Sequence, residues 1–451
     1  PADPERFVSE AVHYVLKIRG GREYTSRLAE LLGCRASDIR NKQEAYDRLY
    51  GFLYSDSESP RRYAERFLSV MNAFDLDAYI KENKDTDKRN DYLKSDMTGF
   101  MPEMTYGLAN APFAIQGFIQ RTIASDKGKP LTICWNFPKK AEGSMGTVDF
   151  RLTEMVAKMA ESGLAVRLIH CGADSAEDMI SWMSHWMPLY LTGRIEPYYL
   201  EGGSGQVFHS AFLLSGTEVL QIEGIEGHAD RGRIIFSNEE DDVIYYSRRA
   251  EDIIAHSEKA LEVIGANDSA RRSDFLMEDA EKPGKRKTLL STPPTYTASQ
   301  ELLEALFTRN KIKKSDRKRI LDYAEYERSR IMRIMRHSEQ EDHIPYITRE
   351  EYDENPIHLS LSGLFYERDI FYTHEEYMRH VEDTRRFMQE NKNYQVVLRQ
   401  GMSFRNIQIF MHSGEWVMIS KNKTPAAHFI IKHPALIDSL EKMIEIYTRR
   451  G

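Results

Sequence analysis

The chain has 451 residues, of which 41% are hydrophobic and 29% charged, and its formal net charge is −8. This length exceeds one ordinary core, so several domains are expected, and the charge excludes a chain that is basic overall while leaving room for a basic patch within one domain. No run approaches 18 consecutive apolar residues and the three cysteines form no CxxC pair, so neither a membrane span nor a disulfide framework is predicted, and a reducing, cytoplasmic location is expected.

The helical spacing of apolar residues within 1–90 predicts an all-helical domain with a helix-turn-helix-like segment. Ala29, Gly33 and Ile39 have the spacing of its small residue, its turn glycine and its apolar anchor. A second helix beginning near residue 36 would present polar and basic side chains to the phosphates and base edges of double-stranded DNA. The candidate DNA-binding residues are Arg27, Arg35, Ser37, Arg40, Asn41 and Lys42. The alternative interpretation is an ordinary helical hairpin that ends in Leu-Gly.

Two distant stretches of the chain have the same order of predicted elements: helix, strand, strand, tight turn, strand, strand, helix. The first copy comprises helix 151–162, strands 164–169, 207–214, 219–222 and 233–236, and helix 243–264. The second copy comprises helix 375–389, strands 394–398, 404–411, 416–420 and 428–431, and helix 434–447. Two strand-rich modules flanked by helices predict an α/β (α+β) protein and not a solenoid. Such halves usually pair and bind a ligand in the seam between them.

These patterns divide the chain into four parts. They are the helical domain 1–90, the first α/β half 91–265, a linker and basic helical connector 266–340, and the second α/β half 341–451. The connector contains Arg309–Arg319, with seven cations and one Asp among eleven residues. A charge run of this kind is most often a solvated helix face, and tracking of nucleic-acid phosphates is the alternative.

Three segments carry a family resemblance, namely 404–409, 416–419 and the Leu-Ser-Gly-Leu-Phe segment 361–365. With these segments and the order of their elements, the two halves resemble the phospholipase D-like fold. The whole chain is similar to helix-turn-helix transcriptional regulators of Firmicutes whose C-terminal region is built from degenerate halves of that fold. The resemblance implies a bacterial transcription factor whose paired halves sense an unknown small-molecule effector or hold a dimer. Lys42 departs from the pattern, because an apolar residue normally stands there in the second helix.

Active members of that fold carry in each half a His-x-Lys motif, followed by an Asp, for phosphodiester chemistry. The corresponding residues are His209, Ala211 and Gly216 in the first half and Asn406, Gln408 and Ser413 in the second. Because both lysines and both aspartates are missing, the resemblance implies an inactive site, and no catalytic residue is predicted. His209 is expected either to be an ordinary histidine on a half-buried strand or to contact a ligand in the seam together with Asn406 and Gln408.

Segment 179–187 has Met, Trp and His residues at helical spacing, within what looks like an insertion of the first half. Such residues most often form core or a dimer interface, and alternatively they form an adaptable apolar wall for a ligand. Trp182 and Trp186 are the candidate ligand contacts of this segment. The scattered histidines and cysteines lack the spacing of a zinc site, so neither a metal nor a cofactor is expected.

The leading functional prediction is a cytoplasmic bacterial transcriptional regulator that is not an enzyme. Its N-terminal helices would contact DNA, and its duplicated region would bind an effector, dimerise, or both. A homodimer is expected because helix-turn-helix proteins commonly read paired half-sites, and no membrane partner is expected. The alternatives are a phosphodiester- or nucleotide-processing enzyme with a site rebuilt around His209, and a non-catalytic interaction scaffold. A cation or general acid beside His209 would favour the enzyme, and a seam closed by apolar packing would favour the scaffold.

Overall fold

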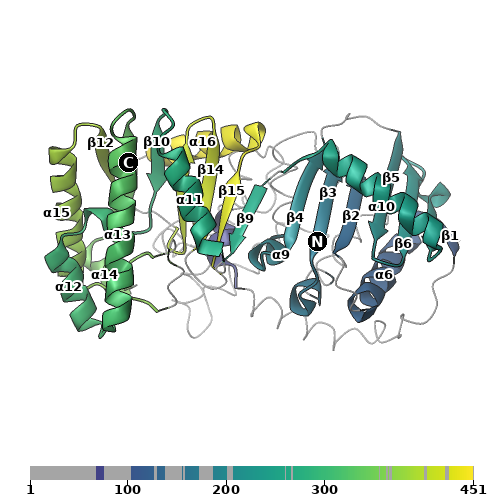
Figure 1. Ribbon diagram of the computed structural model, residues 1–451, viewed down its shortest axis with the longest axis horizontal. Coiled ribbons are helices and arrows are strands. Elements are labelled where there is room, and N and C mark those ends of the chain that lie inside the picture. The colour runs from purple at the N-terminus through teal and green to yellow at the C-terminus, as the bar shows by residue number, and fades with distance from the viewer. Residues whose placement is uncertain are drawn as a thin grey trace, which may run out of the picture. The chain divides into compact units, whose positions relative to one another are not determined.

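Two mixed β-sheets organise the computed structural model (Figure 1). The structure describes residues 68–75, 103–125, 130–137, 155, 158–171, 186–200, 207–259, 261–265, 268–354, 356–361, 364, 368–400, 404–421 and 426–449. These residues fall into two compact units, each with its own sheet. The first-half unit spans Asp75–Val263 and Ile431–Ala435, and the second-half unit combines residues 68–74 with Ile264–Ile430 and Leu436–Gly451.

The first-half unit is built on an eight-stranded sheet with the order β1-β7-β6-β5-β2-β3-β4-β8. Its parallel strands are β2 (Leu131–Asn136), β3 (Val166–Cys171) and β4 (Ile195–Leu200). An antiparallel ladder of β5 (Phe208–Leu214), β6 (Val219–Ile225) and β7 (Arg233–Ser237) continues from β2. The edges are β1 (Met104–Tyr106) and β8 (Glu258–Lys259), and the helical elements are η3 (Leu108–Asn110), α6 (Ala111–Ser125), α9 (Met187–Leu191), η4 (Ala229–Arg231) and α10 (Glu240–Ala255).

The second-half unit is built on a seven-stranded sheet with the order β12-β11-β10-β13-β14-β15-β9. Its strands are β9 (Leu261–Gly265), β10 (Arg286–Leu289), β11 (Gln340–Pro345), β12 (Tyr394–Arg399), β13 (Ile407–His412), β14 (Trp416–Lys421) and β15 (Ala427–Ile431). Its helical elements are α11 (Ser269–Asp279), η6 (Thr295–Thr297), α12 (Gln300–Arg309), α13 (Lys314–Ile334), α14 (Arg349–Glu354), α15 (His374–Glu390) and α16 (Pro434–Arg449). As in the first unit, the three strands β10, β11 and β12 are parallel and β13 runs antiparallel to β10.

The two sheets repeat one topology. The first seven strands of the first sheet have the order β1-β7-β6-β5-β2-β3-β4. Read from its β9 edge, the second sheet has the order β9-β15-β14-β13-β10-β11-β12. With β9 to β15 numbered 1 to 7 along the chain, both sheets have the order 1-7-6-5-2-3-4. Strands β2, β3, β4 and β5 therefore correspond to β10, β11, β12 and β13. The predicted duplication is confirmed, and each copy is larger than the sequence pattern indicates.

The structure differs from the predicted elements in four places. The expected linker and connector 266–340 contains α11, α12 and α13, and its strand β10 lies in the middle of the second sheet. The expected helix 243–264 ends at Ala255 and is followed by β8 and β9. The sequence pattern places strand 164–169 opposite strand 394–398 in the two copies, whereas the strand at its position in the second sheet is β11. The expected insertion after β3 likewise contains α9 and β4, which are ordinary parts of the repeat.

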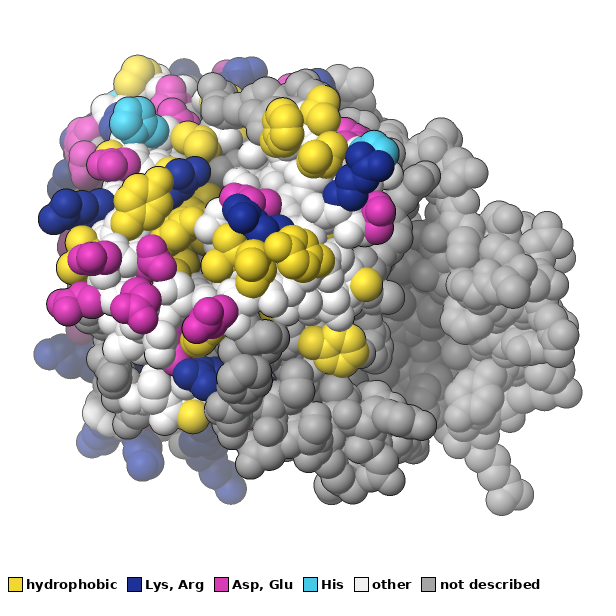
Figure 2. Space-filling model, turned by 90° about the vertical axis from the view of Figure 1, so that its right-hand side faces the viewer, with side chains coloured by type: hydrophobic (Ala, Val, Ile, Leu, Met, Phe, Trp, Pro, Cys, Tyr) yellow, Lys and Arg dark blue, Asp and Glu magenta, His cyan; other side chains and the backbone are white. Residues whose placement is uncertain are grey.

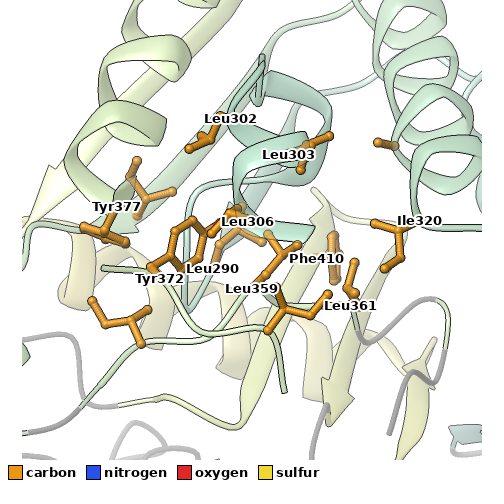
Figure 3. Packing of buried hydrophobic residues seen from close by; sticks show 14 of the residues in the cluster. Leu290, Leu302, Leu303, Leu306, Ile320, Leu359, Leu361, Tyr372, Tyr377 and Phe410 are labelled. Carbon is orange, nitrogen blue, oxygen red and sulfur yellow. The ribbon is translucent and has the colours of Figure 1, made fainter. Parts of the chain in front are cut away.

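Helices that precede β10, β11 and β12 cover one face of the second sheet with an apolar cluster. Leu302, Leu303 and Leu306 are buried on one side of α12, as expected from their helical spacing. They share this cluster with Tyr372 and with Phe410 of β13 (Figure 3). The cluster shields a set of polar side chains on the same face of the sheet from solvent.

Helix ends follow local chemistry. At α15, Thr373 and Glu376 form a reciprocal capping box, which explains why the helix begins where its sequence pattern indicates. At α10, three acidic residues occupy the first turn, where they oppose the positive end of the helix dipole. Within the described residues, no helix combines the length and the apolar composition that crossing a bilayer requires. The predicted N-terminal domain lies outside the described residues, apart from the helical residues 68–73.

Candidate ligand-binding site

A layer of buried polar side chains crosses the middle of the second sheet. Asp342 of β11 is fully buried. Its Oδ1 accepts hydrogen bonds from Thr288 Oγ1 (2.7 Å) and Gln340 Nε2 (2.6 Å). Its Oδ2 accepts from Tyr394 Oη (2.7 Å) and from Tyr296 Oη. Burial, and then the charge of Asp342, raise the pKa of both tyrosines well above the usual value, so both remain hydrogen-bond donors.

The first half has apolar residues at the same positions. In each sheet, the first residues of the three parallel strands pair with one another across the sheet. Residues at the same distance along the strand from this pair of rows are therefore equivalent in the two halves. The equivalents are Leu131 for Arg286, Ile133 for Thr288, Val166 for Gln340, Leu168 for Asp342 and Ile195 for Tyr394. All five first-half residues are buried. Because the topology forms with apolar packing there, and buried polar groups are costly, the polar layer marks a candidate functional site and not a requirement of the fold.

A cavity of ≈ 30 Å³ lies beside the polar layer. Its walls come from the loop after β10, from α13 and from strands β11 and β13. The lining residues that matter for its chemistry are Thr295, Tyr296, Glu327, Arg330, Asp342 and Gln408. The loop after β10 begins at the carboxyl end of a parallel strand, which is where open α/β sheets usually bind their ligands.

Glu327 and Arg330, which line this cavity, form a buried charged group with Arg272, which does not line it. On α13, Arg330 Nη2 donates to Glu327 Oε2 at 2.8 Å. From α11, Arg272 Nη1 lies 3.6 Å from Glu327 Oε1, an ion pair too long for a hydrogen bond. Burial acts to raise the pKa of Glu327, but the charges of Arg330 and Arg272 outweigh it and the pKa lies below the usual value. Glu327 is therefore ionised.

A second polar cluster, in the neighbouring row of the sheet, is structural. Asp279 Oδ1 pairs with His412 Nδ1 and Trp416 Nε1, both at 2.9 Å. Its Oδ2 accepts from Arg286 Nη2 at 2.8 Å. Gly284 has a φ of +137° and a side chain there would collide with His412, so only glycine fits. The cluster ties the end of α11 to β10, β13 and β14.

Gln408 and Asn406, two of the predicted ligand contacts, have different roles in the structure. Gln408 lines the cavity. Asn406 instead binds the chain segment that leads in from the N-terminal region: Asn72 Oδ1 accepts hydrogen bonds from the backbone nitrogens of Arg405 (2.9 Å) and Asn406 (2.8 Å). In return, Asn406 Nδ2 donates to the Asn72 carbonyl oxygen at 2.9 Å.

His209, the third predicted contact, belongs to the first-half unit. Its ring centroid lies 5.7 Å from that of Phe137, and its Nε2 is 3.9 Å from Glu226 Oε2. Among the described residues this charged neighbour is a carboxylate, and whether His209 belongs to a catalytic site stays a prediction. Because His209 and Gln408 belong to different units, their meeting in a seam stays a prediction.

The other predicted residues are placed as follows. Trp186 precedes α9 and is 4% exposed, which fits the core interpretation of its segment. Trp182 and the six candidate DNA-binding residues lie outside the described part of the chain. In the basic cluster, Arg309 pairs with Glu376 at 2.6 Å, while Arg319 on α13 is exposed. Most of this cluster is therefore a helix face in solvent.

Hydrophobic side chains gather on one face of the first-half unit (Figure 2). Among the described residues of this unit, the exposed large hydrophobic ones are Met104, Tyr106, Phe113, Val207, Phe208, Ile244 and Tyr245. Only contiguous exposed apolar patches of several hundred Å² are typical of interaction sites. The expected homodimer stays a prediction.

Apart from Gln408, the residues that make the cavity were missed at the level of sequence. Asp342 and Thr288 lie on strands whose sequences, Gln-Glu-Asp-His-Ile-Pro and Arg-Lys-Thr-Leu, have no apolar alternation. Glu327 and Arg330 lie on a helix whose composition is that of a solvated connector. The usable signal was the duplication itself, because a complete second copy requires strands equivalent to β2 and β3.

Neither a protein-family model nor a curated protein matches the sequence. Among solved structures, a polyphosphate kinase from Porphyromonas gingivalis is similar over 77% of this chain and 50% of its own length, with 12% identity and a TM-score of 0.24. The archaeal chromatin protein TrmBL2, described as showing a novel mode of DNA binding, is similar over 55% of this chain and 98% of its own, with 10% identity and a TM-score of 0.27. This chain thus spans half the length of the polyphosphate kinase. At these scores neither likeness decides the fold or function of the chain.

Proposed function

We propose that this chain is a DNA-binding transcriptional regulator whose second half binds a small polar ligand. The observation that carries ligand binding is the polar layer around Asp342, beside a cavity and at positions where the first half has Leu168 and other apolar residues. A repeated fold that replaces apolar packing by buried polar groups in one copy accepts an energetic cost there. Binding of a polar molecule is the function that accounts for that cost.

The position of Asn406 supports a connection between ligand and DNA. Gln408 lines the cavity and Asn406, two residues earlier, holds Asn72. The helical residues 68–73 follow the segment in which DNA contact is predicted. A ligand that shifts the start of β13 would therefore act on this helix, which is the differential contact that coupling between two sites requires.

The DNA-binding part is supported by the helix-turn-helix spacing of Ala29, Gly33 and Ile39. Its test is fluorescence anisotropy of the full chain with pooled duplex DNA at several salt concentrations. We expect the logarithm of the affinity to fall linearly with the logarithm of the salt concentration, through counterion release. Substituting Arg40→Ala and Lys42→Ala weakens binding, whereas the matched pair Lys318→Ala and Arg319→Ala, exposed on α13, leaves it unchanged. A DNA affinity that does not change with salt concentration contradicts the proposal. A loss of affinity in the Lys318→Ala and Arg319→Ala variant alone also contradicts it.

The ligand-binding part is tested on the same DNA assay. An ultrafiltrate of a bacterial extract is added as the source of small molecules, and the change in DNA affinity is measured. Ser360→Leu fills the cavity, so this variant should no longer respond, whereas Ser315→Leu, exposed on α13, should respond like the natural chain. If the natural chain, Ser360→Leu and Ser315→Leu respond equally, the small molecule binds outside this cavity and the proposal is contradicted.

A further inference from the structure

Two hydrogen-bonding atoms of the cavity-lining side chains have no partner, and they are of opposite kinds. Arg330 Nη2 donates to Glu327 Oε2 at 2.8 Å, which leaves Arg330 Nε as a donor and Glu327 Oε1 as an acceptor. Among the described residues, neither of these two atoms has a partner at hydrogen-bonding distance and angle. Glu327 is 4% exposed and Arg330 5% exposed. Because buried polar groups are normally paired, one donor and one acceptor remain for a molecule inside the cavity.

The formal charges around the cavity balance. Glu327, Asp342 and Arg330 line it. Arg272 does not line it, but its Nη1 lies 3.6 Å from Glu327 Oε1 and its guanidinium lies 5.5 Å from the centre of the Phe410 ring. The nitrogens of Arg272 also lack hydrogen-bond partners, yet they are not part of the cavity wall. Two positive side chains thus stand against two negative ones, so an added ion would bring a buried charge without a partner, and a neutral ligand fits best.

The size of the cavity limits the size of the ligand group. Its volume of ≈ 30 Å³ is room for about two water-sized atoms. A carboxamide carries an acceptor oxygen and a donor nitrogen on one carbon atom, so its polar end has this size and both functions. Its oxygen can accept from Arg330 Nε while its nitrogen donates to Glu327 Oε1. A carboxylate would offer Glu327 a second acceptor, and an amidinium would offer Arg330 a second donor.

We propose that the cavity binds the carboxamide group of a small neutral molecule. This inference rests on the proposed function, since it names the class of ligand for the same cavity. The loop after β10, which contributes Thr295 to the wall, begins at the carboxyl end of a parallel strand, where open α/β sheets usually bind ligands. Water is the alternative occupant, because it also donates and accepts, but a cavity filled by water alone would not select among solutes.

Three probes of the same shape test the carboxamide: acetamide donates and accepts, acetate only accepts, and acetamidinium only donates. Because molecules of this size bind weakly, binding is followed by NMR of the full chain labelled at its isoleucine methyl groups. The reporter is the methyl signal of Ile331, which lines the cavity, and the reference is that of Ile234 in β7 of the first half. We expect a saturable shift of the Ile331 signal with acetamide, and at least about tenfold weaker binding of acetate and acetamidinium.

Substitution of the acceptor should change this preference. Glu327→Gln keeps the shape of the side chain and removes its negative charge, so an anion gains relative to a neutral probe. We expect the ratio of acetamide affinity to acetate affinity to fall at least about tenfold. Glu325→Gln is the matched control, since it is the same substitution at an exposed position of α13, and its ratio should equal that of the natural chain. Ser360→Leu, which fills the cavity, should remove the Ile331 shift with every probe.

The probes on the natural chain decide the inference even if Glu327→Gln does not fold. Acetate or acetamidinium that binds as tightly as acetamide overturns the carboxamide. The absence of a saturable Ile331 shift with acetamide also overturns it and leaves water as the occupant. An unchanged affinity ratio in Glu327→Gln is the third contradicting outcome. The DNA assay with the ultrafiltrate and Ser360→Leu does not depend on these probes, so failure of the carboxamide and failure of the proposed function are distinguishable.

Discussion

Asn72 and Asn406 hold each other by hydrogen bonds in both directions. The side chain of Asn72 accepts from the backbone of residues 405 and 406, and the side chain of Asn406 donates to the backbone of Asn72. Asn72 is 1% exposed. These bonds join residues 68–73 to the beginning of β13, the strand that lines the cavity with Gln408.

Removing this contact should release the helix. Asn72→Ala removes the acceptor of two partly buried backbone N–H groups, each at a cost of about 0.5–1.5 kcal/mol. We expect hydrogen exchange to accelerate in residues 68–74, with little change in β5 and β6 of the first-half unit. If coupling runs through this contact, the variant also loses its DNA response to the ultrafiltrate while retaining DNA binding.

The matched control is Asn110→Ala. The side chain of Asn110 donates one exposed hydrogen bond to the Tyr106 carbonyl, so its loss should change exchange only locally. Equal exchange of residues 68–74 in Asn72→Ala and in the natural chain would show that the helix is held by other contacts.

The polar layer should be replaceable as a whole but not in part. Asp342→Leu leaves four buried donors unpaired and is expected to destabilise the second-half unit by about 3–5 kcal/mol. A combined variant takes its residues from the first half, with Tyr296→Phe removing the last hydroxyl. It contains Thr288→Ile, Tyr296→Phe, Gln340→Val, Asp342→Leu and Tyr394→Ile. Thermal unfolding should show this variant to be more stable than Asp342→Leu alone.

The reason is that an apolar layer at the same positions is already compatible with this topology in the first half. A combined variant that unfolds below Asp342→Leu would mean that the two layers are not equivalent. Leu168→Ile, an apolar exchange in the first-half layer, is the control for ordinary repacking and should cost less than about 1.5 kcal/mol.

Stability should fall between neutral pH and pH 4 through His380. Its Nδ1 pairs with Tyr372 Oη at 2.8 Å and its Nε2 with the Pro294 carbonyl at 3.1 Å. Burial lowers the pKa of His380 from 6.5 to about 4. Because the pKa of His380 is lower in the folded than in the unfolded chain, neutral His380 contributes to the free energy of unfolding. This contribution is complete above pH 6.5 and is lost as the pH falls toward 4.

The expected loss from this residue is on the order of 3 kcal/mol. Urea unfolding followed by circular dichroism at several pH values measures it, with His380→Gln beside the natural chain. The variant should show a flatter profile in this window. Burial also lowers the pKa of His343 and His428, so part of the slope remains. Parallel profiles for the two proteins would assign the slope to other groups, among them these two histidines and Glu327.

Sequence patterns predicted the second copy well where its strands are apolar on both faces. Strand β14 was expected at 416–420 and is Trp416–Lys421, and all its residues are buried. Helix α15 was expected at 375–389 and is His374–Glu390, because a capping box and an amphipathic pattern define it. Both signals are local, so neighbouring residues suffice to express them.

Strands β10 and β11 could not be predicted in this way. Their inward side chains include Thr288 and Asp342, which are polar because each has a hydrogen-bond partner in the fold. A strand whose buried face is polar has the composition of a surface segment. Its partners, such as Tyr296 and Tyr394, come from other parts of the chain and leave no periodic pattern near it.

The sequence by itself determined that the chain contains one α/β module twice and that the expected positions of a phosphodiester site lack their lysines and aspartates. These are properties of order and identity along the chain. Only the tertiary structure decided that Asp342 meets four donors and that Arg272 and Arg330 share Glu327. Partners of buried polar groups are chosen by three-dimensional proximity and not by spacing along the chain, and the candidate site consists of such groups.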